Sequence, residues 1–285
     1  TEEGQNWNLP AMEPVALRRN NYRHMIDLLR ANMSPFGALR IDHVMGLLRL
    51  WWCLPGVAGG AYVYYPLEEL LAILRLESQR NRCRVVGEDM GVVPDELRAR
   101  MKATGVYSNK VFYFERQHDH QFKQPQDHQP DALLMVTNHD VSTLAGWWNA
   151  RDLDIRCEIG LLDAENERPA LMLERQQDKA RLLAWLETQQ LLPEGWADKE
   201  TDLAVLQKFD FLLCRAILLA SARSRSQMML FQLEDLQLLE DPVNIPGTYR
   251  EYPNWRRKQA LETEALFDLS EVQELLSSID RERVQ

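Results

Sequence analysis

The sequence has few cysteines, and none is placed for a disulfide framework or a zinc site. The 285 residues include four, Cys53, Cys83, Cys157 and Cys214, which are far apart and lie among apolar or helix-forming residues. No CxxC pair and no Cys/His spacing of the kind that binds a metal occurs. We therefore expect free thiols in a reducing, cytoplasmic environment and no bound metal.

The sequence also lacks an excess of positive charge and any long apolar run. It has 33 Lys and Arg residues against 43 Asp and Glu residues, a net charge of −10. This balance argues against nucleic acid or an anionic membrane as the main partner, because both attract basic surfaces. No apolar run approaches the roughly 20 residues that a membrane-spanning helix needs. A neutral substrate is compatible with this charge.

Five short apolar segments alternate with amphipathic ones, and each ends at an acidic residue. The expected strands are 37–42, 84–87, 111–114, 132–136 and 228–233. The acidic residues at or just after their ends are Asp42, Glu88, Glu115, Asp140 and Glu234. The expected helices are 15–33, 67–82, 95–102, 168–190, 201–222 and 262–276. Such alternation predicts an α/β fold with parallel strands. Ligands of these folds bind at the carboxyl ends of the strands, so we expect the five carboxylates on one rim.

Residues 37–43 have the charge arrangement that a carboxylate nucleophile needs. Arg40 and Asp42 alternate with Leu39 and Ile41, so on a strand both would lie on one face. A neighbouring arginine favours the ionised form of a carboxylate, and an ionised carboxylate at a strand end can act as a nucleophile. For this segment alone, an ordinary ion pair at the strand edge is the more frequent explanation.

Glu88 and Asp140 complete a set of three carboxylates suited to glycosidic chemistry. This chemistry places two carboxyl groups around an oxocarbenium-like transition state, one of them ionised and the other protonated because it is poorly solvated. Asp42 fits the first role, and Glu88, which follows the apolar residues 85–87, fits the second. His139 and Asp140 fit a third role, binding sugar hydroxyls and stabilising positive charge.

Aromatic residues near these carboxylates offer flat apolar faces with polar tips, on which sugar rings can stack. The candidates are Trp7, Trp51, Trp52, Tyr62, Tyr64, Trp147 and Trp148. For each one alone, packing in the core or anchoring of a loop remains a slightly more frequent role.

Ordered blocks of the sequence, Arg40-Ile-Asp42-His43, Gly87-Glu88-Asp89 and His139-Asp140, resemble the α-amylase superfamily. The finer resemblance is to the 4-alpha-glucanotransferases, also called amylomaltases or disproportionating enzymes, of glycoside hydrolase family 77. Segments 4–7, 48–52, 60–66, 86–91, 143–148, 244–248 and 254–255 carry it. They span nearly the whole chain in order, which is more specific than any single motif.

The resemblance implies an α/β fold that forms the C-terminal portion of a TIM (β/α)8 barrel, about strands 4 to 8. It implies a helix-rich subdomain or insertion at about 150–226, with the N-terminal strands and a further domain missing from this sequence. The chain begins at Thr1 in a loop-like stretch, from which we likewise expect a piece of a longer enzyme. Because the missing strands would close the barrel and contact substrate, we expect this piece alone to fold poorly or to be inactive.

The resemblance also implies an activity and residue roles. The activity would be retaining transfer of α-1,4-glucan segments between maltooligosaccharides, without a cofactor. Asp42 would be the nucleophile, Glu88 the general acid/base and Asp140 the stabilising carboxylate. The implied substrate-binding residues are Arg40, His43, His139, Trp7, Trp51, Tyr62 and Tyr64.

Three alternatives remain open at this point. The first is an α-glucan hydrolase of the same superfamily, and the second is an inactive glucan-binding fragment. The third is an unrelated barrel enzyme that uses the carboxylates of the rim to bind Mg²⁺.

Overall fold

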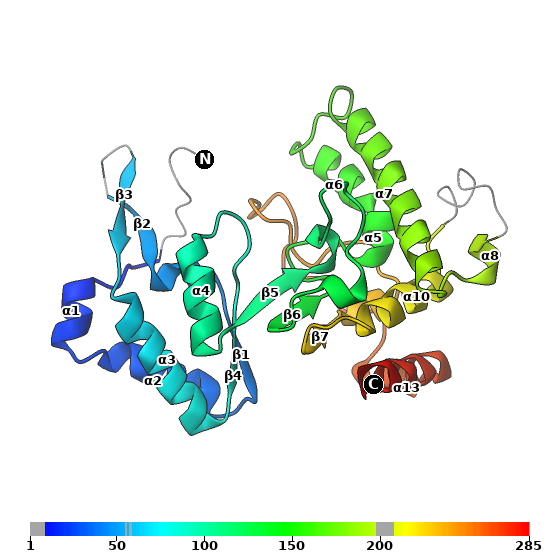
Figure 1. Ribbon diagram of the computed structural model, residues 1–285. Coiled ribbons are helices and arrows are strands. Elements are labelled where there is room, and N and C mark those ends of the chain that lie inside the picture. Colours follow the sequence, from blue (N-terminus) through cyan, green and yellow to red (C-terminus); the bar gives the residue numbers. More distant parts are fainter. Residues whose placement is uncertain (1–8, 55, 57–58, 198–207, 285) are drawn as a thin grey trace. The chain divides into compact units, whose positions relative to one another are not determined.

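The computed structural model describes residues 9–54, 56, 59–197 and 208–284 (Figure 1). Five strands form one sheet in the order β1-β4-β5-β6-β7, and β2 and β3 form a separate pair. The chain divides into two compact units, residues 1–110 with 131–133, and residues 111–130 with 134–285. The α/β fold expected from the sequence is confirmed.

The first unit alternates helices with parallel strands. Its helices are α1 (Pro14–Arg19), α2 (Arg23–Met33), α3 (Leu67–Asn81) and α4 (Asp95–Thr104), with a 3-10 helix at Val44–Leu47. Its strands are β1 (Ala38–Ile41), β2 (Arg49–Cys53), β3 (Gly60–Tyr64), β4 (Arg84–Gly87) and β5 (Tyr107–Val111). Strands β1, β4 and β5 run parallel, with Arg40 opposite Val86 and Val86 opposite Tyr107. Asp42 and Glu88 therefore follow the carboxyl ends of adjacent strands.

The helix expected at 15–33 is two helices. Asn21 and Tyr22 adopt left-handed backbone angles, with φ of 51° and 56°, which end the first helix. The turn lets both helices bury apolar residues in the same core, since Leu17 and Leu29 are both less than a tenth exposed. The periodic pattern continues through the break, so it does not reveal it.

The glycine- and aromatic-rich stretch 46–66, in which no strand was expected, contains an antiparallel strand pair, the β2–β3 hairpin. Strands β2 and β3 pair with Arg49 opposite Tyr64 and Trp51 opposite Tyr62. Aromatic and β-branched residues suit such cross-strand pairs, and here they form strands despite the neighbouring glycines, which disfavour strand structure.

The second unit is mostly helical. Its helices are α5 (Leu144–Trp148), α6 (Arg151–Glu158), α7 (Arg168–Thr188), α8 (Glu194–Ala197), α10 (Phe211–Ala222), α11 (Leu233–Leu236), α12 (Thr263–Asp268) and α13 (Ser270–Val284). It also contains 3-10 helices at Phe112–Phe114 and Pro125–Asp127, strand β7 (Met228–Leu230) and the end of β6 (Ala132–Met135). Residues 201–207 of the helix expected at 201–222 lie outside the described residues.

Two expected strands are shifted. The segment 111–114 is mainly a 3-10 helix, in which Phe112 is buried and stacks on Phe122 at 4.7 Å between ring centroids. The actual strand, β5, precedes it and was missed because its Asn109 and Lys110 are polar. Strand β7 ends at Leu230, so Glu234 lies in the first turn of α11, where the helix dipole favours an acidic residue.

Each unit has its own hydrophobic core. The core of the first unit contains Met33, Val44, Leu71, Leu74 and Leu97, and that of the second contains Trp148, Leu186, Leu213, Ile217 and Leu275. Trp147 and Trp148 are buried in the second core, which favours packing over sugar binding for both. Within the part of the chain that the structure describes, no helix is long and apolar enough to cross a membrane.

Candidate active site

Asp42 is held by the arginine that the sequence places beside it. Nη1 of Arg40 donates to Oδ1 of Asp42 at 2.7 Å, which confirms the predicted contact. Nε of the same guanidinium donates to Oδ1 of Asn109 on β5 at 2.8 Å. Arg40 is thus fixed from two sides, while the Asp42 side chain remains 66% exposed and accessible to a ligand.

Asp89, the residue after Glu88, binds two residues of β5 through its buried side chain. Its side chain is fully buried and accepts hydrogen bonds from the Ser108 hydroxyl and the Asn109 backbone N–H, both at 3.0 Å. Nζ of Lys110 lies 3.4 Å away, and Nε of Arg98 lies 3.8 Å away. These cations compensate a buried charge that would otherwise be costly. Asp89 therefore supports Asn109, which in turn supports Arg40.

Glu88 is buried beside Asp42, as its apolar preceding residues suggest. Its two carboxyl oxygens each accept a backbone N–H, from His43 at 2.9 Å and from Met90 at 2.7 Å. His43 adopts a left-handed conformation, with φ of 43°, and its N–H points at Glu88. The apolar residues before Glu88 predict its burial but not these two hydrogen bonds.

Three of the predicted sugar-binding aromatics share one face of the β2–β3 hairpin. Trp51 lies edge-on to Tyr62 at 5.1 Å between ring centroids, and Tyr62 and Tyr64 are more than half exposed. The Arg49 guanidinium lies 4.2 Å from the centroid of the Tyr62 ring. Trp52 alternates to the other face and donates to the Tyr65 hydroxyl at 3.3 Å. The hairpin thus presents an exposed aromatic face.

In the second unit, the side chains of His139 and Asp140 form a polar pair, a contact that the sequence did not predict. Nε2 of His139 lies 3.0 Å from Oδ2 of Asp140, and Nδ2 of Asn244 donates to Oδ1 of Asp140 at 2.9 Å. The ring of Trp255 lies 5.3 Å from the His139 ring. A carboxylate, an imidazole and an exposed aromatic ring are the groups that recognise sugar hydroxyls and sugar faces.

Glu115 and Glu234, the other two acidic residues expected on the rim, are engaged in hydrogen bonds with neighbouring side chains. Glu115 accepts from Nζ of Lys123 at 2.9 Å, and Glu234 accepts from the side-chain amide of Gln259 at 2.8 Å. Next to Glu234, Asp235 is fully buried and accepts from the Thr137 hydroxyl and the Leu144 N–H. Burial raises the pKa of Asp235 to about 6.

Trp7, also predicted to bind substrate, lies outside the described residues. No role was expected from the sequence for Asn109, which contacts Arg40 in the first unit, or for Asn244 and Trp255, which contact Asp140 and His139 in the second. Asn244 and Trp255 lie in segments that carry the family resemblance, which is the one signal that could have found them. Among the described side chains, no group of three or more His, Cys, Asp or Glu is arranged to hold a metal ion.

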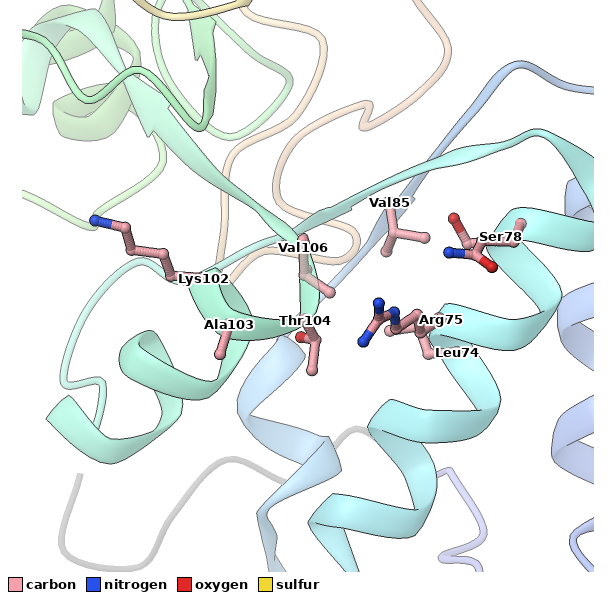
Figure 2. Close-up of a pocket in the computed structure, with 10 residues that line it drawn as sticks. Leu74, Arg75, Ser78, Val85, Lys102, Ala103, Thr104 and Val106 are labelled. Carbon is pink, nitrogen blue, oxygen red and sulfur yellow. The ribbon is translucent and has the colours of Figure 1, made fainter.

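A cavity of about 410 Å³ lies between α3 and α4, near Val85 and Val106 (Figure 2). Figure 2 shows Arg75 reaching into this space and Lys102 pointing away from it. Val85 lies near the start of β4, whereas Glu88 follows its end, so the cavity is at the opposite end of the strand from the catalytic candidates. It therefore contributes nothing to the site.

A family model described as 4-alpha-glucanotransferase, Glyco_hydro_77, matches residues 1–262. The chain belongs to this family. A 4-alpha-glucanotransferase of Haemophilus influenzae is 42% identical over 259 residues, which are 90% of this chain and 36% of that protein. One from Mycobacterium tuberculosis is 32% identical over 259 residues, 89% of this chain and 34% of that protein. This chain thus spans about a third of the length of these 4-alpha-glucanotransferases.

Solved structures support the same family fold. The amylomaltase of Corynebacterium glutamicum superimposes with a TM-score of 0.85 and 25% identity, over 99% of this chain and 40% of that one. The amylomaltase of Streptococcus agalactiae, solved in complex with acarbose, gives a TM-score of 0.67 at 16% identity, over 98% of this chain and 48% of that one. This 4-alpha-glucanotransferase family member therefore has the expected fold, a portion of a TIM barrel.

Proposed function

We propose that this chain carries the catalytic carboxylates of a 4-alpha-glucanotransferase, which moves an α-1,4-glucan segment from one maltooligosaccharide to another. The observation that carries the proposal is the Arg40–Asp42 pair beside Glu88, within a chain matched by the family model over residues 1–262. The free cysteines suit a cytoplasmic enzyme, because thiols stay reduced there.

In the proposed reaction Asp42 attacks the anomeric carbon of the donor while Glu88 protonates the departing glycosidic oxygen. The product is a covalent glucosyl-enzyme with Asp42 and a shortened sugar. Glu88, now ionised, takes the proton of the acceptor 4-hydroxyl, whose oxygen displaces Asp42 from the anomeric carbon. Two displacements at the same carbon retain its configuration.

The two hydrogen bonds that Glu88 accepts determine how its carboxyl group can donate and accept a proton. To donate a proton, one of its oxygens must direct an O–H at the glycosidic oxygen, on the lone pair that does not accept the backbone N–H of His43 or Met90. The other oxygen can keep its N–H, because a protonated carboxyl group still accepts hydrogen bonds. After the proton leaves, both N–H groups can again stabilise the carboxylate.

Asp140 is assigned to the stabilisation of positive charge on the sugar during both displacements. Both of its carboxyl oxygens are fixed, by Nε2 of His139 and by Nδ2 of Asn244. A carboxylate held in one orientation need not reorganise as the charge develops, and we infer that this is the role of the two neighbours.

Incubation with pure maltotriose tests the proposal, with Asp42→Asn as the inactive control. The expected products are glucose and a ladder of longer maltooligosaccharides, separated by thin-layer chromatography, and no ladder from the variant. The chain is assayed alone and in a chimera, in which it replaces the matching segment of the Haemophilus relative, and the chimera is expected to give the ladder. Reducing ends that rise in step with cleavage, without longer products, would identify a hydrolase. No product from either preparation would refute the proposal.

A further inference from the structure

The loop from Asp241 to Arg257 is tied to itself by the side chain of Asn254. The Asn254 amide accepts from the Ile245 N–H at 2.9 Å and donates to the Thr248 hydroxyl at 2.8 Å. The Tyr252 hydroxyl closes the base of the loop by donating to the Pro242 carbonyl at 2.5 Å. These bonds pre-organise the loop without any ligand.

Trp255, next in the chain, is held in an unfavourable conformation and is largely exposed. Its φ of 59° lies in the left-handed region, which a bulky residue rarely adopts and which costs on the order of 1–3 kcal/mol. Its N–H donates to the Val243 carbonyl at 2.9 Å, which fixes this conformation. Its side chain is 65% exposed, so burial in a core does not account for the cost. Strain of this kind clusters at functional sites.

The exposed ring of Trp255 is placed against the residues around Asp140. It lies 5.3 Å from the ring of His139, at an interplanar angle of 42°. The same loop supplies Asn244, whose amide donates to Asp140. One loop therefore brings a flat apolar surface and a polar anchor to one carboxylate.

We propose that Trp255 is a stacking platform for a pyranose ring of the glucan bound at Asp140. The flat face of a pyranose is apolar and its rim is hydroxylated, which matches an exposed indole beside a carboxylate, an imidazole and an amide. The left-handed backbone keeps the ring facing the ligand rather than the protein interior. The inference rests on the proposed function, because it takes the ligand to be an α-1,4-glucan.

Two substitutions separate the ring from the backbone. Trp255→Asn removes the ring but tolerates the left-handed conformation, and Trp255→Phe retains an aromatic face. On the Asp42→Asn background, titration calorimetry with maltoheptaose should give an affinity at least about tenfold weaker for the Asn variant, equivalent to about 1.4 kcal/mol. The Phe variant should stay within about threefold. The thermal midpoint of the Asn variant should not fall, since its backbone strain is smaller.

Tyr249 provides the matched control, because it lies in the same loop, is 82% exposed and has the Arg250 guanidinium 5.9 Å from its ring centroid. Tyr249→Ala should leave the affinity unchanged. Equal affinity of the Trp255→Asn variant and its parent would overturn the inference, and so would an equal loss in Tyr249→Ala. Binding does not require turnover, so a maltotriose ladder with unchanged Trp255→Asn affinity refutes this inference alone. The absence of both a ladder and maltoheptaose binding refutes the proposed function as well.

Discussion

At the residue scale, Asp42 is oriented by a chain of contacts rather than by Arg40 alone. Arg40 is held by Asn109, and the backbone of Asn109 is held by buried Asp89. Each link is a hydrogen bond with a charged partner, the type that contributes most when it is well aligned.

Asn109→Ala removes the acceptor that fixes Nε of Arg40, so the guanidinium can swing away from Asp42. We expect kcat for maltotriose transfer to fall about tenfold or more, a loss of about 1.4 kcal/mol of transition-state stabilisation, with little change in KM. Ser108→Ala is the control, because it removes a side-chain hydrogen bond of the neighbouring β5 residue, to Asp89, but does not touch Arg40. An equal fall in kcat for both variants would show that only general support of β5 matters.

Asp235 makes stability depend on pH in a direction that is unusual for a carboxyl group. Burial raises its pKa to about 6 from an ordinary 3.8, so the folded chain binds this proton more tightly than the unfolded chain. The resulting stabilisation is present below about pH 4 and is lost as the pH rises through about 6.

Asp235→Asn should flatten this dependence, because asparagine is neutral and can still accept from Thr137. Between pH 4 and pH 6 we expect the free energy of unfolding of the native chain to fall relative to the variant by about 1–3 kcal/mol. Urea unfolding at several pH values measures this free energy. If the free energy of unfolding of the two proteins changes in parallel with pH, the prediction is wrong.

At the scale of elements, the β2–β3 hairpin depends on a glycine that lies under an indole ring. A Cβ added to Gly60 would lie 2.2 Å from the Trp52 carbonyl oxygen and 2.7 Å from Nε1 of Trp51. The Trp52 carbonyl oxygen cannot move without disturbing the strand pairing, so there is no room for a side chain at position 60 and glycine is required.

Gly60→Ala should lower the free energy of unfolding by roughly 1–3 kcal/mol, the usual cost of overpacking. It should also weaken maltooligosaccharide binding if the face with Trp51 and Tyr62 contacts sugar. Gly37→Ala is the control, because a Cβ there meets nothing within 4 Å, and its effect should stay within about 0.5 kcal/mol. Chemical unfolding distinguishes the two, and similar values would contradict the packing argument.

At the scale of the whole molecule, the two hydrophobic cores share no described residue. Separate cores are expected to open as separate cooperative units, since each stabilises its own helices and strands. The unit with β1 and β4 carries Asp42 and Glu88, and the unit with α10 carries Asp140.

Leu74→Ala creates a cavity in the first core, where Leu74 is fully buried. It should lower the free energy of unfolding of the first unit by about 2–5 kcal/mol. Hydrogen exchange should accelerate in α3 and β4, while α10 keeps its protection. Mass spectrometry of peptides from both units makes the measurement. Equal acceleration in α10 would show that the units unfold together.

The sequence by itself determined the features that depend on neighbours along the chain. A period of two residues placed Arg40 and Asp42 on one face, and an apolar run ending at Gly87 placed Glu88 at a strand end. The start of a helix was predicted where a proline marks it, as at Asp95 of α4, which follows Pro94. The break at Tyr22, the hairpin and the polar strand β5 were missed because tertiary packing outweighs local pattern there.

Only the tertiary structure decided which distant residues contact the candidate catalytic residues in each unit. Asn109 contacts Arg40 across 69 residues, and Asn244 contacts Asp140 across 104. Such contacts follow from strand register and from the path of a loop, neither of which leaves a local periodicity. The same holds for Trp255, whose left-handed backbone is imposed by a hydrogen bond to Val243 and not by its own preference.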